Sequence, residues 1–236
     1  AVGRRALDAN TTGASNTAIG SESLGSNTTG SNNVSVGMNA LYANTTGGAN
    51  TAIGYEALKT STTPNNNNAF GYGALEDCTT GNNNIAIGVQ AARNITTGSR
   101  IVAIGTNALD QATTVSDSTA IGYAALINCT SGANNVAVGK DALQETTTGG
   151  NNTAIGTRAL EDNTTASDNT AVGYAALTNN TTGAYNTAVG SEALVNNTTG
   201  DNNTAIGEHA LREVNTGSQN TALGTNAADQ ITSGEN

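Results

Sequence analysis

A glycine recurs with a 17-residue period along the chain, from Gly3 to Gly224, with no insertion or deletion between copies. Fourteen copies of one 17-residue unit therefore account for the 236 residues. A fixed short period is typical of a solenoid, in which each repeat packs mainly against its neighbours. A unit this short cannot hold two helices, so the period predicts an all-β protein, a parallel β-solenoid with one coil per unit.

The chain begins and ends inside a unit, and neither terminal copy differs from the others in the way a cap would. Solenoids normally carry capping repeats with a polar outer face. We therefore expect residues 1–236 to form a single β-solenoid repeat region of 14 coils that belongs to a longer fibrous protein.

The common unit reads N-T-A-I-G-x-x-A-L-x-x-N-T-T-G-x-x, as residues 50–66 illustrate with local changes. The residue before the recurring glycine is apolar in every copy, and the residue two positions earlier is mostly Thr, Val or Ile. Side chains at i and i+2 of a strand share a face, so we expect pairs such as Thr51 and Ile53 to point into the coil. Leu58 and its equivalents are predicted to form a second core layer.

The residue between those two is Ala in thirteen copies and Ser35 in the other. An open, solvated face would vary, so a position held this small indicates close approach of another surface. We expect Ala52, Ala86, Ala154 and their equivalents to face outward, against another copy of the chain. A cramped corner within the same chain is the alternative.

Turns are predicted at two places in each unit. The recurring glycine, represented by Gly54, Gly88 and Gly156, marks a corner after the strand, and the glycine of T-T-G permits a turn with positive φ. The unit then holds two short strands, N-T-A-I-G and x-N-T-T. One helical turn in the x-x-A-L-x-x stretch is an open alternative.

Asparagine recurs at two further positions of the unit. One, thirteen residues after the glycine, includes Asn33 and Asn50 and is predicted to make a turn and a side-chain ladder between coils. The other, seven residues after the glycine, mixes Asn with Ile and Cys. That mixture indicates a semi-buried site where stacked Asn side chains form amide ladders.

Composition excludes several classes of partner. The net charge is −10, which argues against nucleic acid because the phosphate backbone requires a basic surface. No apolar run approaches the ~18 residues of a membrane span, so we expect no membrane insertion by this segment. Only 3% of the residues are aromatic, so stability must come from regular stacking, and self-association would add to it.

The two cysteines, Cys78 and Cys129, occupy the same position of the unit three copies apart. At ~4.8 Å per coil they would lie about 14 Å apart. That exceeds the ~7 Å limit between the Cα atoms of a disulfide. We expect two free, semi-buried thiols, and a pairing between chains only if this position lies near a symmetry axis.

Around Thr51-Ala52-Ile53-Gly54-Tyr55-Glu56-Ala57 the sequence resembles the head repeats of trimeric autotransporter adhesins. Those repeats combine a valine-alanine-isoleucine-glycine strand with a small residue three positions further on, in a shorter unit. The chain is also similar to repeats of phage and bacterial tail-fibre-type proteins. The resemblance implies a left-handed β-roll that assembles as a homotrimer, with its strands against the threefold axis.

No catalytic or metal-binding constellation is evident, and we expect neither enzyme activity nor a cofactor nor a metal. The single histidine, His209, falls at a variable position and is predicted to lie on the surface. Without further His or clustered Cys, a zinc site or a Ser-His-Asp triad has no ligands or base. Adjacent acids such as Glu161 and Asp162 are predicted to be solvated.

Four tyrosines share the position directly after the glycine: Tyr55, Tyr72, Tyr123 and Tyr174. The first two should be neighbours on adjacent coils. Exposed aromatic side chains in one register can stack on sugars or anchor a receptor. The alternative is that they only cover the edge of the coil.

The sequence therefore predicts a structural or adhesive fibre segment, outside the cell, on the cell surface or in a virion tail fibre. It would act as a rigid spacer whose variable edge residues attach to a surface glycan or protein through many weak contacts. A filament subunit without a ligand of its own, an ice-binding solenoid and a hydrolase built on a β-solenoid are the alternatives.

Overall fold

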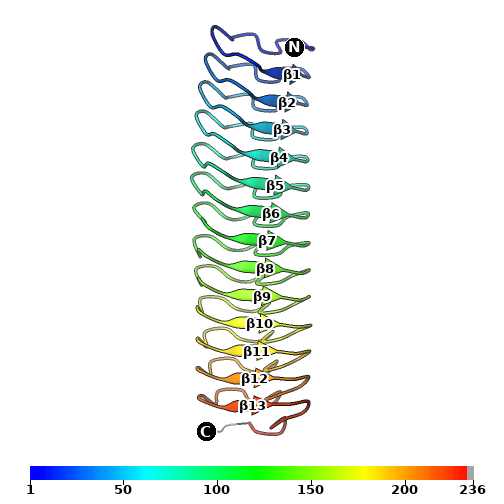
Figure 1. Ribbon diagram of the computed structural model, residues 1–236, viewed down its shortest axis with the longest axis vertical. Coiled ribbons are helices and arrows are strands. Elements are labelled where there is room, and N and C mark those ends of the chain that lie inside the picture. The colour runs from blue at the N-terminus through cyan, green and yellow to red at the C-terminus, as the bar shows by residue number, and fades with distance from the viewer. Residues whose placement is uncertain (233–236) are drawn as a thin grey trace. The chain divides into compact units, whose positions relative to one another are not determined.

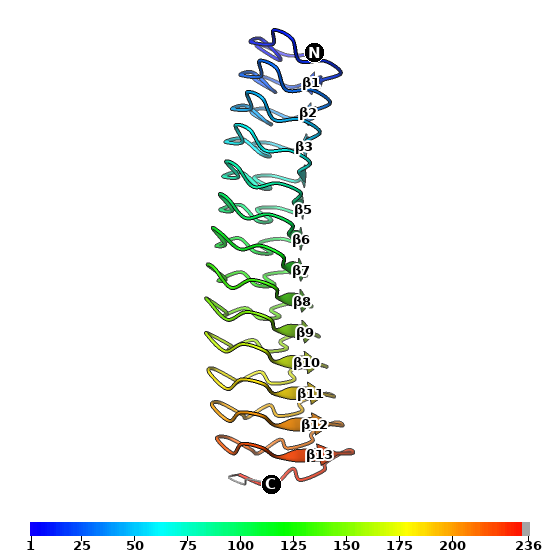
Figure 2. The same ribbon diagram turned by 60° about the vertical axis from the view of Figure 1, so that its left-hand side comes forward.

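The computed structural model describes residues 1–232. The chain is an all-β parallel β-solenoid with a 17-residue repeat, as predicted. It divides into two compact units, Ala1–Asp117 and Ser118–Asn236. Within each unit the strands stack one after another in chain order (Figure 1). Figure 2 shows that the strands of each unit follow one side of its coils, whereas the connecting turns make up the rest.

Each coil contributes one strand of three residues, paired in parallel with its equivalent one repeat along the chain. In the first unit the strands are β1 (Thr17–Ile19), β2 (Val34–Val36), β3 (Thr51–Ile53), β4 (Asn68–Phe70), β5 (Ile85–Ile87) and β6 (Val102–Ile104). In the second they are β7 (Thr119–Ile121), β8 (Val136–Val138), β9 (Thr153–Ile155), β10 (Thr170–Val172), β11 (Thr187–Val189), β12 (Thr204–Ile206) and β13 (Thr221–Leu223). An isolated bridge between Val2 and Ile19 adds a further copy at the start of the first unit.

The core of each coil consists of Ala from the strand and of the Ala-Leu pair that follows the glycine. Ala52, Ala57 and Leu58 are fully buried, as are their equivalents in most other coils. The leucine layer was predicted correctly.

The orientation of the strand is the reverse of the prediction. Ala86 has no exposed surface within its own chain, whereas the flanking Ile85 and Ile87 point outward, and Ile87 is 41% exposed. The coil is narrow and Leu already fills its interior, so at this point it accommodates only a small side chain, Ala or Ser. Ala52, Ala86 and Ala154, each without exposed surface, therefore cannot contact a second chain.

The second half of the repeat forms no strand, contrary to the prediction of two strands per coil. Successive coils are still hydrogen-bonded there, since the backbone N–H and the side-chain hydroxyl of Thr45 both donate to the Thr62 carbonyl, at 2.8 and 3.0 Å. The x-x-A-L-x-x stretch is not a helical turn either. Glu56 and Leu58 adopt left-handed φ values of 58° and 52°, which fold this stretch into consecutive tight turns.

The two recurring glycines of the repeat are required for different physical reasons. Gly54 has a φ of 144°, and a Cβ there would lie 2.2 Å from the carbonyl oxygen of Gly71. Gly88 and Gly156 repeat this arrangement, with φ values of 137° and 138°. The glycine of T-T-G does not need a positive φ, contrary to the prediction. At Gly30 the constraint is space, since a Cβ would lie 2.3 Å from the Gly47 carbonyl oxygen.

Both predicted asparagine ladders are present. In the ladder seven residues after the glycine, Nδ2 of Asn44 donates to Oδ1 of Asn27 at 2.7 Å, and Asn27 donates in turn to Asn10 at 2.9 Å. In the other, the backbone N–H of Asn50 donates to Oδ1 of Asn33 at 3.0 Å. These bonds satisfy buried polar groups in a coil that has little apolar side chain to bury.

Candidate binding surfaces

The outward side chains of the strands form what we call the strand face. In each unit it combines one file that is apolar throughout with a neighbouring file of Thr, Val, Ile or Asn. Its exposed large apolar side chains include Ile53, Phe70, Ile85 and Ile87 in the first unit, and Ile121, Ile155, Ile206 and Leu223 in the second. The chain itself leaves this face open to solvent.

The tyrosine file lies next to the strand face, directly after the glycine. Tyr55 and Tyr72 are neighbours on adjacent coils, as predicted, with ring centroids 5.3 Å apart and ring planes inclined by 10°. Met38 and Val89 occupy the equivalent positions in the coils on either side, and both are exposed. The first unit therefore extends its apolar strand face sideways over four successive coils.

Tyr123 and Tyr174 are also exposed, but they are not stacked on one another like the first pair. Their equivalents in the following coils are Lys140 and Ser191. Tyr174 is 51% exposed and lies at a hollow of the second unit, described below.

The charged edge of the first unit is organised by ion pairs between coils. Nζ of Lys59 lies 2.9 Å from Glu56 and 3.7 Å from Glu76. The hydrogen bond from Lys59 holds the pKa of Glu56 below its usual range, whereas burial raises the pKa of Glu76. On a different edge, Arg100 makes a bidentate pair with Asp117, at 2.6 and 2.7 Å. Both edges are partly exposed to solvent, so such pairs stabilise the fold only weakly.

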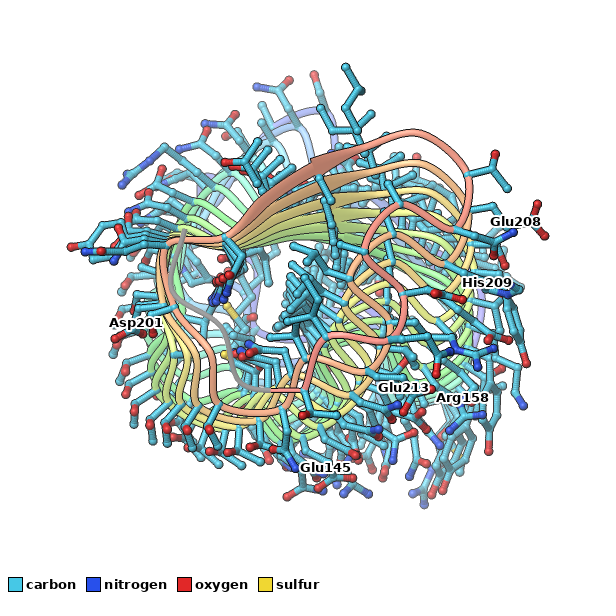
Figure 3. The ribbon with its side chains drawn as sticks, turned by 90° about the horizontal axis from the view of Figure 1, so that it is seen from below. Glu145, Arg158, Asp201, Glu208, His209 and Glu213 are labelled. Carbon is cyan, nitrogen blue, oxygen red and sulfur yellow. The ribbon has the colours of Figure 1, made fainter. Side chains whose placement is uncertain are left out.

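In the second unit an open hollow of about 380 Å³ lies on the charged side of the coils. Figure 3 places Arg158 and Glu213 on this side and Asp201 on the opposite side. We call it the Tyr174 hollow, and its lining residues are Arg158, Tyr174, Ala175, Thr178, Asn179, Glu192, Val195, Asn196, Arg212 and Glu213. Of these residues, only Tyr174 was predicted from the sequence as a candidate binding residue. The overlooked signal is Ala175, a short residue whose equivalents in the adjacent coils are Arg158 and Glu192.

His209 lies at the corner that follows β12, beside Glu208 (Figure 3). Its Nε2 is 3.4 Å from Glu192 and its Nδ1 is 3.2 Å from the side-chain oxygen of Asn226. Within residues 1–232 no three His, Cys, Asp or Glu side chains form a group that could hold a metal ion.

Cys78 and Cys129 are free and buried, each with its sulfur near the carbonyl oxygen three residues later. Burial raises the pKa of both thiols to about 11. The two groups are therefore more deeply enclosed than the semi-buried thiols that the sequence predicted.

In comparisons with known proteins, no family model and no curated protein matches the chain. No helix among the described residues is long and apolar enough to cross a membrane.

Proposed function

We propose that this chain is a self-associating structural segment of a fibre, located outside the cell or on a virion. Its role would be mechanical and not enzymatic. The observation that supports the proposal best is the strand face, where Ile53 and Ile87 are 38% and 41% exposed although their coils keep Ala52 and Ala86 inside.

A second copy of the chain is the partner that fits this face best. Sheets made only of parallel strands are normally covered on both sides, and monomeric proteins rarely expose long apolar patches. Burial of apolar surface stabilises an assembly by roughly 25 cal/mol per Å². A file repeated once per coil would supply that contribution along each unit. The resemblance to adhesin head repeats favours three copies around a threefold axis, in left-handed coils.

Surface attachment would use the edges that remain outside such an assembly. The positions that carry Lys59, Arg93 and Arg158 differ from coil to coil far more than the core positions do. A weak contact at one coil gains from contacts at other coils and on other copies, because each further contact forms at high effective concentration. Attachment to a glycan or protein receptor and a passive spacer role are both consistent with this arrangement.

Positive charges introduced on the strand face test whether the chain associates through it. We expect the double variant Ile53→Lys and Ile87→Lys to dissociate into 23.4 kDa chains, because facing lysines would be desolvated and would repel one another. The matched control is Asn66→Lys with Asn83→Lys, two exposed residues that share their position in the repeat with Arg100 of the coil after Asn83. Light scattering should give the wild-type mass for the control. Equal masses for both double variants would contradict the proposal.

Ice binding is a second candidate because of one observation. In the second unit Thr153, Thr170, Thr187, Thr204 and Thr221 form an unbroken outward file beside the apolar file. Ice-binding solenoids present two such files, and here only one is threonine. Thermal hysteresis at high protein concentration, lost in Thr170→Lys with Thr204→Lys, would favour ice binding over self-association.

A further inference from the structure

The Tyr174 hollow exists because one side chain is short. Ala175 occupies the position that Arg158 holds in the preceding coil and Glu192 in the following coil, and it is only 5% exposed. Thr178, 3% exposed, and Val195 complete a short-chained floor, while longer polar side chains form the walls. The volume of about 380 Å³ falls within the range of small-ligand sites, which is roughly 300–1,000 Å³.

One wall is a fixed ladder of polar groups that crosses three coils. Nδ2 of Asn179 donates to Oδ1 of Asn196, and Nδ2 of Asn196 donates to Glu213, both at 3.3 Å. Nε of Arg212 also donates to Glu213, at 3.1 Å. This wall holds amide donors, amide acceptors and a carboxylate in a fixed order, and each keeps unused hydrogen-bonding capacity.

Both arginines that line the hollow are paired with a carboxylate. Arg158 bonds Glu161 through Nε, Arg212 bonds Glu213, and Glu192 lies 3.4 Å from His209. No unpaired cation is left among these groups to attract a phosphate or a carboxylate. The hollow therefore suits an uncharged ligand that offers both hydrogen-bond donors and acceptors.

Tyr174 adds an aromatic surface at the rim. Tyr174 is half exposed and lines the hollow together with Arg158. Glu161, and to a lesser extent Tyr174, raise the pKa of that guanidinium. An aromatic ring with a polar tip suits a ligand that is apolar on one face and polar at its edges.

We propose that the Tyr174 hollow binds a neutral hexose, with one sugar face on the ring of Tyr174 and the hydroxyl groups on Asn179, Asn196 and Glu213. A hexose combines uncharged hydroxyls with a patch of C–H groups, which matches the paired charges and the aromatic rim. The proposed role in surface attachment supplies the biological use of such a site. All of its lining residues belong to one chain, so binding can be measured separately from association.

The test uses the full-length chain and methyl glycosides of glucose, galactose, mannose and N-acetylglucosamine, observed by saturation-transfer NMR. We expect at least one of them to bind with a millimolar dissociation constant. Ala175→Arg should fill the hollow and weaken binding at least tenfold, and Tyr174→Ala should do the same. Arginine is compatible with this backbone position, because Arg158 occupies it in the preceding coil at a φ of 62°.

Matched controls come from another coil of the same unit. Ala124 has the same position, a φ of 55° and the same 5% exposure as Ala175. Ala124→Arg should leave binding unchanged. Absence of saturation transfer from all four glycosides, or equal binding by Ala175→Arg and wild type, would overturn the proposal. So would stronger binding of an acidic sugar such as glucuronate.

The mass of each sample is measured in parallel by light scattering. An associated chain that fails to bind hexose would refute hexose binding at the hollow but not the proposed self-association. A monomeric chain that binds hexose would refute self-association but not hexose binding.

Discussion

The side-chain oxygen of Asn50 accepts a hydrogen bond from the backbone N–H of Asn67, one coil further along, at 3.0 Å. Asn50 also donates through its backbone N–H to Oδ1 of Asn33, at 3.0 Å, and through Nδ2 to the Pro64 carbonyl, at 2.8 Å. One buried amide thus joins three successive coils. Stability in this fold depends on such bonds because the apolar core of each coil is so small.

Replacement of Asn50 by alanine should lower the free energy of unfolding by about 3 kcal/mol, since it leaves several buried partners unpaired. Chemical denaturation measures the difference. Asn32→Ala is the control: Asn32 is exposed with a φ of 60°, and Ala49 occupies the equivalent place in the next coil. Its loss should stay below about 1 kcal/mol. Similar losses for the two variants would contradict a structural role for the ladder.

Gly54→Ala should destabilise the chain by about 3 kcal/mol or more, because it combines an unfavourable φ with a backbone clash. A Cβ at Gly54 would lie 2.2 Å from the Gly71 carbonyl oxygen. Gly73 provides the comparison: its φ is 60°, and the nearest atom to a Cβ is the flexible end of Glu76 at 3.3 Å. Gly73→Ala should cost about 1 kcal/mol. Thermal melts of both variants would reveal the difference.

Asp162→Asn should stabilise the chain at pH 7 by a few tenths of a kcal/mol, as expected for a partly exposed charge. Burial raises the pKa of Asp162 above its ordinary value of 3.8, and Glu161 and Glu145 raise it further. A raised carboxyl pKa means that ionisation weakens the fold. The penalty is complete above the folded-state pKa and disappears as the pH falls to 3.8, so the advantage of the variant should disappear there too.

Adding a carboxylate at the next coil tests whether buried negative charge is what weakens the fold. Asn179 occupies the position equivalent to Asp162. Asn179→Asp should therefore lower stability at pH 7 and recover as the carboxyls are protonated. Denaturation curves between pH 4 and pH 7 that were parallel for wild type and both variants would exclude the electrostatic cause.

The cysteines should react only after unfolding. Burial raises the pKa of the Cys78 and Cys129 thiols to about 11, so at pH 8 roughly one thiol in a thousand is ionised, and neither sulfur is accessible. Iodoacetamide should label neither cysteine in the native chain at pH 8 and both in 6 M guanidinium chloride. Rapid native labelling of Cys78 would show that its coil opens.

The period and the ladders were predictable from sequence because they depend on spacing. Asn33 and Asn50 hold the same position in consecutive repeats, so any stacked coil brings them together whatever its cross-section. The prediction about the strand failed because alternation separates two faces without saying which is inside. Hydrophobicity favoured Ile53 for the interior. The coil is too narrow for Ile53 there, so Ala52 lies inside. The small residue at this position in every copy was the more informative signal.

The hollow was missed in the sequence for a different reason. It depends on one short side chain, Ala175, with long neighbours before and after it in space. Those neighbours, Arg158 and Glu192, are each one full repeat away along the chain. Only the stacked coils show that Thr178 and Val195 leave the same space unfilled.

If another copy of the chain covers the strand face, as we propose, the mass in solution must exceed that of a single chain. Multi-angle light scattering on a dilution series should give a constant multiple of 23.4 kDa, with three copies as the predicted number. A mass of 23.4 kDa at every concentration would show that the strand face stays uncovered in solution and would contradict the proposed self-association.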